Sequence, residues 1–171
     1  IAINLWLFSA FFIDGYGAAG NIMGGKLLGA KNYDGLWDLA KKIMLYGFVI
    51  SLILAAVGFL FYRPIGRIFS NDLTVLQAFY SIFFILILGI PMNMVAFVFD
   101  GLFKGLGEMK YLRNVLLVAT FLGFVPILFL GKFLGWGLYG IWIAFTLWMF
   151  IRGGALVWKF RRKFRPLLQN V

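Results

Sequence analysis

The sequence contains no cysteine and no histidine. Without cysteine there are no disulfide bridges and no thiol chemistry. Without histidine the chain lacks a common metal ligand and cannot build a Ser/His/Asp arrangement for hydrolysis. We therefore predict that the protein is not an enzyme and that it holds no metal and no cofactor.

Charged residues are also scarce: they make up 13% of the 171 residues, whereas 63% are hydrophobic and the mean hydropathy is +0.96. Because a soluble domain is only about half apolar, this composition indicates a membrane protein. Five segments reach the roughly 20 apolar residues that a spanning helix needs. We predict an all-α, polytopic membrane helix bundle with one transmembrane domain over residues 1–165 and a C-terminal tail at 166–171. Its five transmembrane helices are expected at about 1–28, 36–62, 73–106, 111–131 and 135–164.

The start of the chain is unusual for a complete membrane protein. There is no initiator methionine, and Ile1 already lies in an apolar run with no basic stretch before it, unlike a signal peptide. Because an odd number of spans begins inside a helix, we expect further sequence upstream.

The net charge of +10 comes from basic residues in the short segments between the apolar spans. Nucleic-acid binding needs a folded polar surface, so we predict no nucleic-acid partner and interpret the charge as an orientation signal. The first and third loops and the tail are the most basic, which predicts a multi-pass protein of the inner (plasma) membrane, in contact with membrane lipid, with a cytoplasmic C-terminus. The residues are Lys26, Lys31, Lys41 and Lys42; Lys104, Lys110 and Arg113; and Lys159, Arg161, Arg162, Lys163 and Arg165.

One acid interrupts the first apolar run, "FFIDGYGAAGN" at residues 11–21. Asp14 precedes Lys26 by twelve residues, about 18 Å along a helix, which places it near the middle of the membrane. Asn21 follows by nearly two turns, so it shares a helix face with Asp14 and with small residues. In one interpretation this face lines a cavity in which Asp14 binds a cation or a proton. In the other, Asp14 is buried in a hydrogen-bond network at a close helix contact.

Asn93 and Asp100 repeat the same seven-residue spacing in the third span. Asn93 follows Pro91, where freed carbonyl groups can coordinate an ion or be satisfied by neighbouring helices. Asp100 precedes Lys104 by four residues, the favourable order for a local ion pair. Arg152 is the one basic residue well inside a span, and its long side chain can reach Asp100 or, less easily, Asp14. We predict that Asp100, Lys104 and Arg152 are structural ion-pair residues.

Three motifs, "FFIDGYGAAGNIMGGKLLGAKNYDGL", "FVFDGLFKGLGEMKYLRN" and "IRGGALVWKFRRKF", occur in this order. Together they resemble the second half of the MATE (multidrug and toxic compound extrusion) transporters, and the Asp-Gly pairs are most similar to the DinF-type branch. The resemblance implies twelve helices in two lobes around a central cavity, with this chain as helices eight to twelve, a partial C-terminal lobe. The partner that completes it is then the N-terminal lobe of the same protein.

The activity that the resemblance implies is secondary active antiport. Organic cations, drugs or metabolites, small amphipathic or cationic compounds, are exported in exchange for H⁺ or Na⁺. The substrate- or ion-binding candidates are Asp14, Asn21 and Asn93. Two departures bear on the coupling ion, because many members carry an acid at the position of Asn21 and some sodium-type members carry one near Asn93.

Two alternatives to antiport remain open. A lipid-linked oligosaccharide flippase of the same superfamily shares the helix plan but needs a more positive cavity for pyrophosphate, and only Arg152 and Lys26 offer such charge. The second alternative is a non-transporting membrane fragment. Five spans alone do not enclose a cavity that two lobes form together.

Overall fold

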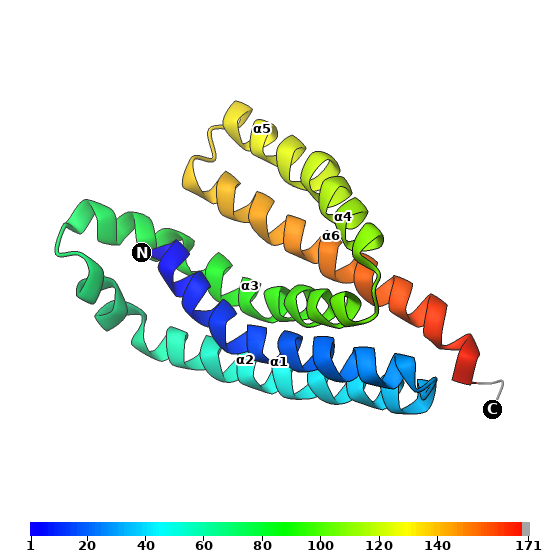
Figure 1. Cartoon of the computed structure of the whole chain (residues 1–171). Helices are drawn as coiled ribbons and strands as arrows, with labels where there is room; N and C mark the ends of the chain where they lie inside the picture. The colour runs from blue at the N-terminus through cyan, green and yellow to red at the C-terminus, as the bar shows by residue number, and fades with distance from the viewer. Residues whose placement is uncertain (169–171) are drawn as a thin grey trace.

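The computed structural model describes residues 1–168, which form helices joined by short turns (Figure 1). The order is α1 (Ala2–Gly29), α2 (Tyr33–Phe69), α3 (Leu73–Gly105), α4 (Met109–Val118), the π-helix η1 (Ala119–Phe124), α5 (Val125–Phe133), α6 (Leu138–Phe164) and the 3₁₀ turn η2 (Pro166–Leu168). The prediction of an all-α helix bundle is confirmed. Of the predicted tail, 166–168 form η2, and 169–171 lie outside the described residues.

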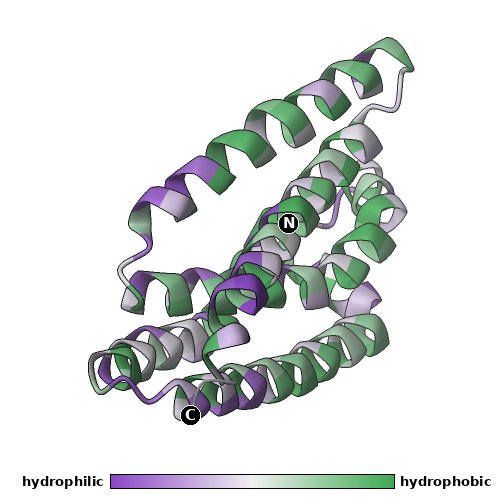
Figure 2. Cartoon of the chain, turned by 90° about the vertical axis from the view of Figure 1, so that its right-hand side faces the viewer, coloured by the Kyte–Doolittle hydropathy of each residue, from purple (hydrophilic) through white to green (hydrophobic). Residues whose placement is uncertain are grey.

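Hydrophobic residues recur along the helices and alternate with paler and hydrophilic stretches (Figure 2). Four helical segments are long and apolar enough to cross a membrane: Tyr33–Phe69, Leu73–Gly105, Met109–Phe133 and Leu138–Phe164. α1 has 28 residues but is not one of these four segments. It carries Asn4, Asp14, Asn21 and several glycines.

Helix α2 continues past the predicted end at residue 62 and runs to Phe69. The backbone leaves helical geometry at Phe61, with φ −108° and ψ 15°, three residues before Pro64. Because proline has no N–H and its ring crowds the preceding turn, it kinks a helix rather than extending it straight. The segment that includes Pro64 is therefore a bent continuation of α2 rather than a turn.

The fourth span is also irregular. α4 and α5 are joined by the π-helix η1, which ends two residues before Pro126. Proline removes the hydrogen bond that its N–H would donate to the preceding turn, and a π-bulge is a common way to accommodate such a break. The hydroxyl of Thr120 within η1 donates to the carbonyl oxygen of Leu116 at 2.8 Å.

Helix α3 lies at the centre of the bundle and packs against α1, α2 and α6. α1, α3 and α6 run in one direction, and α2 and the α4–α5 span run in the other (Figure 1). The α1–α2 turn, the α3–α4 turn and the end of α6 therefore lie at the same end of the bundle. Most of the basic residues lie at or near this end, which is called the basic end below.

The contact between α1 and α3 brings the two main chains together. A Cβ atom added to Gly101 would overlap the carbonyl oxygen of Gly17, and one added to Gly105 would overlap that of Asn21. Only glycine permits this approach, as in other close contacts between membrane helices. The glycine in each of these contacts fixes how α1 sits on α3, and with it where Asp14 lies.

Candidate functional site

The polar residues of α1 lie beside this glycine contact. Asp14 and Asn21 are exposed, whereas Gly17 and Gly24 on the neighbouring face are buried against α3. Among residues 1–168, no hydrogen bond or ion pair engages the carboxylate of Asp14. The sequence predicted that Asp14 and Asn21 share one helix face with small residues. In the structure the two polar residues lie on an exposed face, and the glycines lie on an adjacent buried face.

Asn93 lies on α3, one turn after Gly89. Its side chain is 3% exposed, and its Nδ2 atom lies close to Gly89, whose added Cβ would be 4.0 Å away. Within the described part of the chain its amide forms no side-chain hydrogen bond. An amide without a protein partner retains its hydrogen-bonding capacity, so Asn93 is a polar group that can meet a ligand or another segment.

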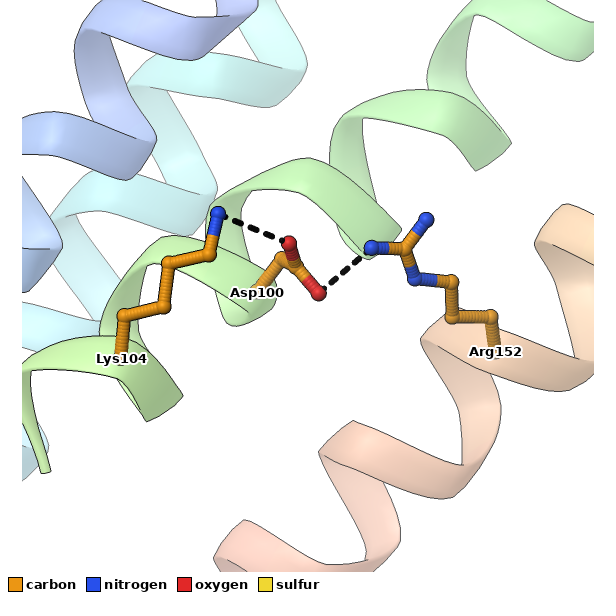
Figure 3. Close-up of polar contacts among 3 residues, drawn as sticks. All are labelled: Asp100, Lys104 and Arg152. Atoms are coloured by element: carbon orange, nitrogen blue, oxygen red, sulfur yellow. Dashed lines mark hydrogen bonds and ion pairs between the residues drawn. The ribbon is translucent and has the colours of Figure 1, made fainter. Parts of the chain in front are cut away.

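Asp100 lies between two basic side chains (Figure 3). Its Oδ1 accepts a hydrogen bond from Nη2 of Arg152 in α6 at 2.6 Å, and its Oδ2 lies 3.2 Å from Nζ of Lys104. The side chains of Asp100 and Arg152 are only 12% and 15% exposed, whereas that of Lys104 is 49% exposed. A carboxylate and a guanidinium at this distance form a strong charge-assisted bond, which joins α3 to α6.

Aromatic residues complete the surroundings of Arg152. Its guanidinium carbon lies 5.6 Å from the ring centroid of Trp148, within the range of a cation–π interaction. The indole N–H of Trp148 in turn donates to the hydroxyl of Thr120 in η1 at 3.1 Å. Sequence reasoning did not single out Trp148 or Thr120. A chain with 20% aromatic residues gives no local signal for one tryptophan.

Trp6 was also not selected as a site residue, although it connects three helices. Its ring lies 5.8 Å from that of Phe97 in α3 and 5.1 Å from that of Phe145 in α6, measured between centroids. Its indole nitrogen is buried without a hydrogen-bond partner in the described chain. Within the described residues, this nitrogen is the one fully buried side-chain polar atom that has no hydrogen-bond partner.

No group of three His, Cys, Asp or Glu side chains lies close enough to hold a metal ion anywhere in residues 1–168.

Comparisons with known proteins agree with this architecture. The MatE family model matches residues 1–129. Protein DETOXIFICATION 42 of Arabidopsis thaliana is 27% identical over 93% of this chain, and the probable multidrug resistance protein YoeA of Bacillus subtilis is 27% identical over 71% of it. These matches cover 30% and 27% of the two relatives, so the chain spans about a third of their length or less.

The fold is similar to that of a solved transporter. A crystal structure of the Vibrio cholerae MATE transporter VcmN superimposes with a TM-score of 0.77 over 96% of this chain and 39% of that one, at 19% sequence identity. The same transporter in its bent form gives a TM-score of 0.75 over 99% of this chain. The chain belongs to the MatE family, a family of membrane transporters rather than of enzymes.

Proposed function

We propose that this chain forms part of the C-terminal lobe of a secondary active antiporter that exports organic cations, drugs or metabolites in exchange for H⁺ or Na⁺. Family membership supports transport, and the names of the relatives refer to detoxification and multidrug resistance. The observation that carries the proposal is the set of polar side chains within the spans that have no partner in the described chain: Asp14 on α1 and Asn93 on α3.

The proposed role of Asp14 follows from the energetics of an acid in a membrane. An ionised carboxylate at the bilayer centre is costly unless it meets water, a proton or a cation. The exposed face of α1 offers Asp14 to the remainder of the protein, which would supply the opposite wall of a cavity. There the carboxylate alternates between the coupling ion and a cationic substrate. The amides of Asn21 and Asn93 contribute neutral oxygens to the same cavity.

Arg152, Asp100 and Lys104 have a structural role in this proposal. Asp100 neutralises the one cation well inside a span, and the pair fixes α6 against α3 at the edge of the cavity. The same geometry argues against a lipid-linked oligosaccharide flippase. A pyrophosphate needs unpaired cations, and of the two candidates Arg152 is directed to Asp100, which leaves Lys26 as the one without an ion pair among residues 1–168.

We also propose that the protein belongs to the DinF-type branch and lies in the inner (plasma) membrane with its C-terminus in the cytoplasm. The Asp-Gly pairs at 14–15 and 100–101 favour the DinF-type branch. The basic end of the bundle supports a cytoplasmic C-terminus in the inner (plasma) membrane, because cytoplasmic loops carry the excess of lysine and arginine. The N-terminal lobe of the same protein and membrane lipid are the proposed partners.

The test is export of a fluorescent cationic dye from cells that make the full-length protein. Dye efflux is measured after a Na⁺ gradient or a pH gradient is imposed separately, which identifies the coupling ion. Faster efflux under one inward ion gradient, relative to cells without the protein, supports antiport. Efflux that is unaffected by either gradient would exclude ion-coupled export. It would leave the flippase, tested by complementation of a flippase-deficient strain, or a non-transporting membrane fragment.

A further inference from the structure

Two apolar grooves run along α6 on the side where it faces α2 and α3, and both begin at the same basic residue. The first, of about 170 Å³, lies between α2 and α6 and includes Trp37, Lys41 and Met44 of α2. The second, of about 390 Å³, lies between α3 and α6 and includes Met92, Phe150 and Gly154. Val157 and Arg161 of α6 line both grooves. The two grooves therefore meet at Val157 and Arg161, and the end at Arg161 is called the mouth below.

The mouth of these grooves is positively charged. Arg161 and Lys41 are both exposed, and Arg161 forms no ion pair within the described residues. Lys41 lies 3.8 Å from Asp38, but both side chains are about two-thirds exposed, so this pair is weak and leaves the lysine available. The Nζ atom of Lys41 lies 6.0 Å from the ring centroid of Trp37, which packs in turn on Phe160 of α6. This aromatic stack holds the lysine beside the mouth.

The length of the second groove matches one leaflet of a bilayer. Phe150 precedes Arg161 by eleven residues, which is about 16 Å along a helix. Half of a hydrocarbon core is about 15 Å thick. A chain that starts at Arg161 and follows the groove therefore ends near the middle of the membrane. The position of Gly154 leaves the groove open, because a Cβ atom added there would meet nothing within 4 Å.

We propose that this surface is a binding site for one anionic phospholipid. The phosphate lies between Lys41 and Arg161, one acyl chain follows the larger groove, and the first part of the other enters the smaller groove beside Val157. Basic pockets between membrane helices recognise anionic lipid headgroups, and the grooves supply the apolar contact that a diffuse basic surface lacks. A packed protein helix would need acidic residues of its own to pair the two cations, whereas a lipid phosphate carries the counter-charge in its headgroup.

The experiment uses the full-length protein in vesicles of equal phosphatidylglycerol and phosphatidylcholine, followed by native mass spectrometry of the lipid that stays bound. Wild type should retain phosphatidylglycerol. Lys41→Gln and Arg161→Gln should each reduce retention about fivefold, the effect of one basic residue near a membrane surface. The matched controls are Lys42→Gln and Arg162→Gln, which remove the same charges one residue away and should retain lipid as wild type does. Equal losses in these controls would overturn the proposal in favour of diffuse attraction.

A second variant tests the groove without changing charge. Gly154→Leu places a side chain into open space and also favours the helix, so the protein should fold normally. The variant should retain less phosphatidylglycerol than wild type. A photoactivatable phosphatidylglycerol that cross-links to residues 149–161 of wild type should no longer cross-link to this segment of the variant. Unchanged retention in Gly154→Leu would overturn the site. Absence of any cross-link to this segment in wild type would also overturn it, because another part of the protein or a second copy then covers the grooves.

Discussion

Arg152 of α6 donates a hydrogen bond to Asp100 of α3 across 2.6 Å, and both side chains are almost buried. The two residues are 52 positions apart in the sequence, so the bond joins two spans rather than two turns of one helix. The bond thereby fixes the position of α6 on α3.

Asp100→Asn should destabilise the protein by about 3 kcal/mol, because it leaves the guanidinium of Arg152 nearly buried without a counter-charge. Thermal unfolding of the full-length protein in detergent measures the change. Lys104→Gln is the matched control and should cost less than about 1 kcal/mol, since that lysine is half exposed. Adding Arg152→Gln to Asp100→Asn should restore part of the loss, and failure of this rescue would show that the charge is compensated elsewhere.

Gly101→Ala should destabilise the contact between α1 and α3 by about 3 kcal/mol or more. The new methyl group overlaps the carbonyl oxygen of Gly17, and main chains cannot yield as a flexible side chain does. Folded yield and melting temperature measure the effect. Gly15→Ala changes the same kind of residue on an exposed part of α1 where nothing lies within 4 Å, and should remain within about 1 kcal/mol of wild type. Similar losses in both variants would contradict the close packing described.

Asp72 caps the start of α3, and its stabilising effect should depend on pH. Hydrogen bonds hold the pKa of Asp72 below its ordinary value. The backbone N–H groups of Thr74 and Val75 have the largest effect, and the Thr74 side chain has a smaller one. A lowered pKa in the folded state means that the ionised acid stabilises the helix above about pH 3.9. That contribution is lost as the pH falls through the folded-state pKa.

Hydrogen exchange at the Thr74 amide should therefore be faster in Asp72→Ala than in wild type at neutral pH, and the difference should shrink in acid. Asp72→Asn is the control, because asparagine is an equally good cap without a charge, and its exchange should vary less with pH. A difference between wild type and Asp72→Ala that is constant with pH would contradict this account.

Asp14→Asn should abolish the ion dependence of dye export while leaving the amount of folded protein unchanged. The substitution keeps the size of an exposed side chain with no partner in the described chain, so it removes only the charge. Ion-driven efflux from cells that make the full-length protein measures the effect. Asp34→Asn, in the exposed first turn of α2, is the control and should export as wild type does. Export with unchanged coupling in Asp14→Asn would remove Asp14 from the mechanism.

Composition alone was enough to predict a helical membrane bundle, because few structures other than helices satisfy backbone hydrogen bonds in lipid. The apolar runs also located α3 and α6 closely. They did not reveal that α2 continues beyond Pro64 or that η1 is a π-helix, since the course of a helix around a proline depends on the neighbours that receive its freed groups.

Part of the candidate site could be predicted from the sequence. Asp14, Asn93 and Arg152 stand out because polar residues are rare in apolar spans. Trp6 and Trp148 do not stand out, since their importance comes from tertiary contacts with α3, α6 and η1. Helical periodicity placed Asp14 with Gly17, but only the packing shows that Gly17 faces α3 while Asp14 remains exposed.

The main-chain contacts at Gly101 and Gly105 have a mechanical consequence. Two helices whose backbones touch at successive turns cannot slide or rotate past each other without collision. We therefore expect α1 and α3 to move as one rigid unit. Bending is then concentrated where helical hydrogen bonding is already irregular, at Phe61 in α2 and at η1 between α4 and α5. We therefore expect any change in the shape of the bundle to move Asp14 and Asp100 together, with bending at Phe61 and η1.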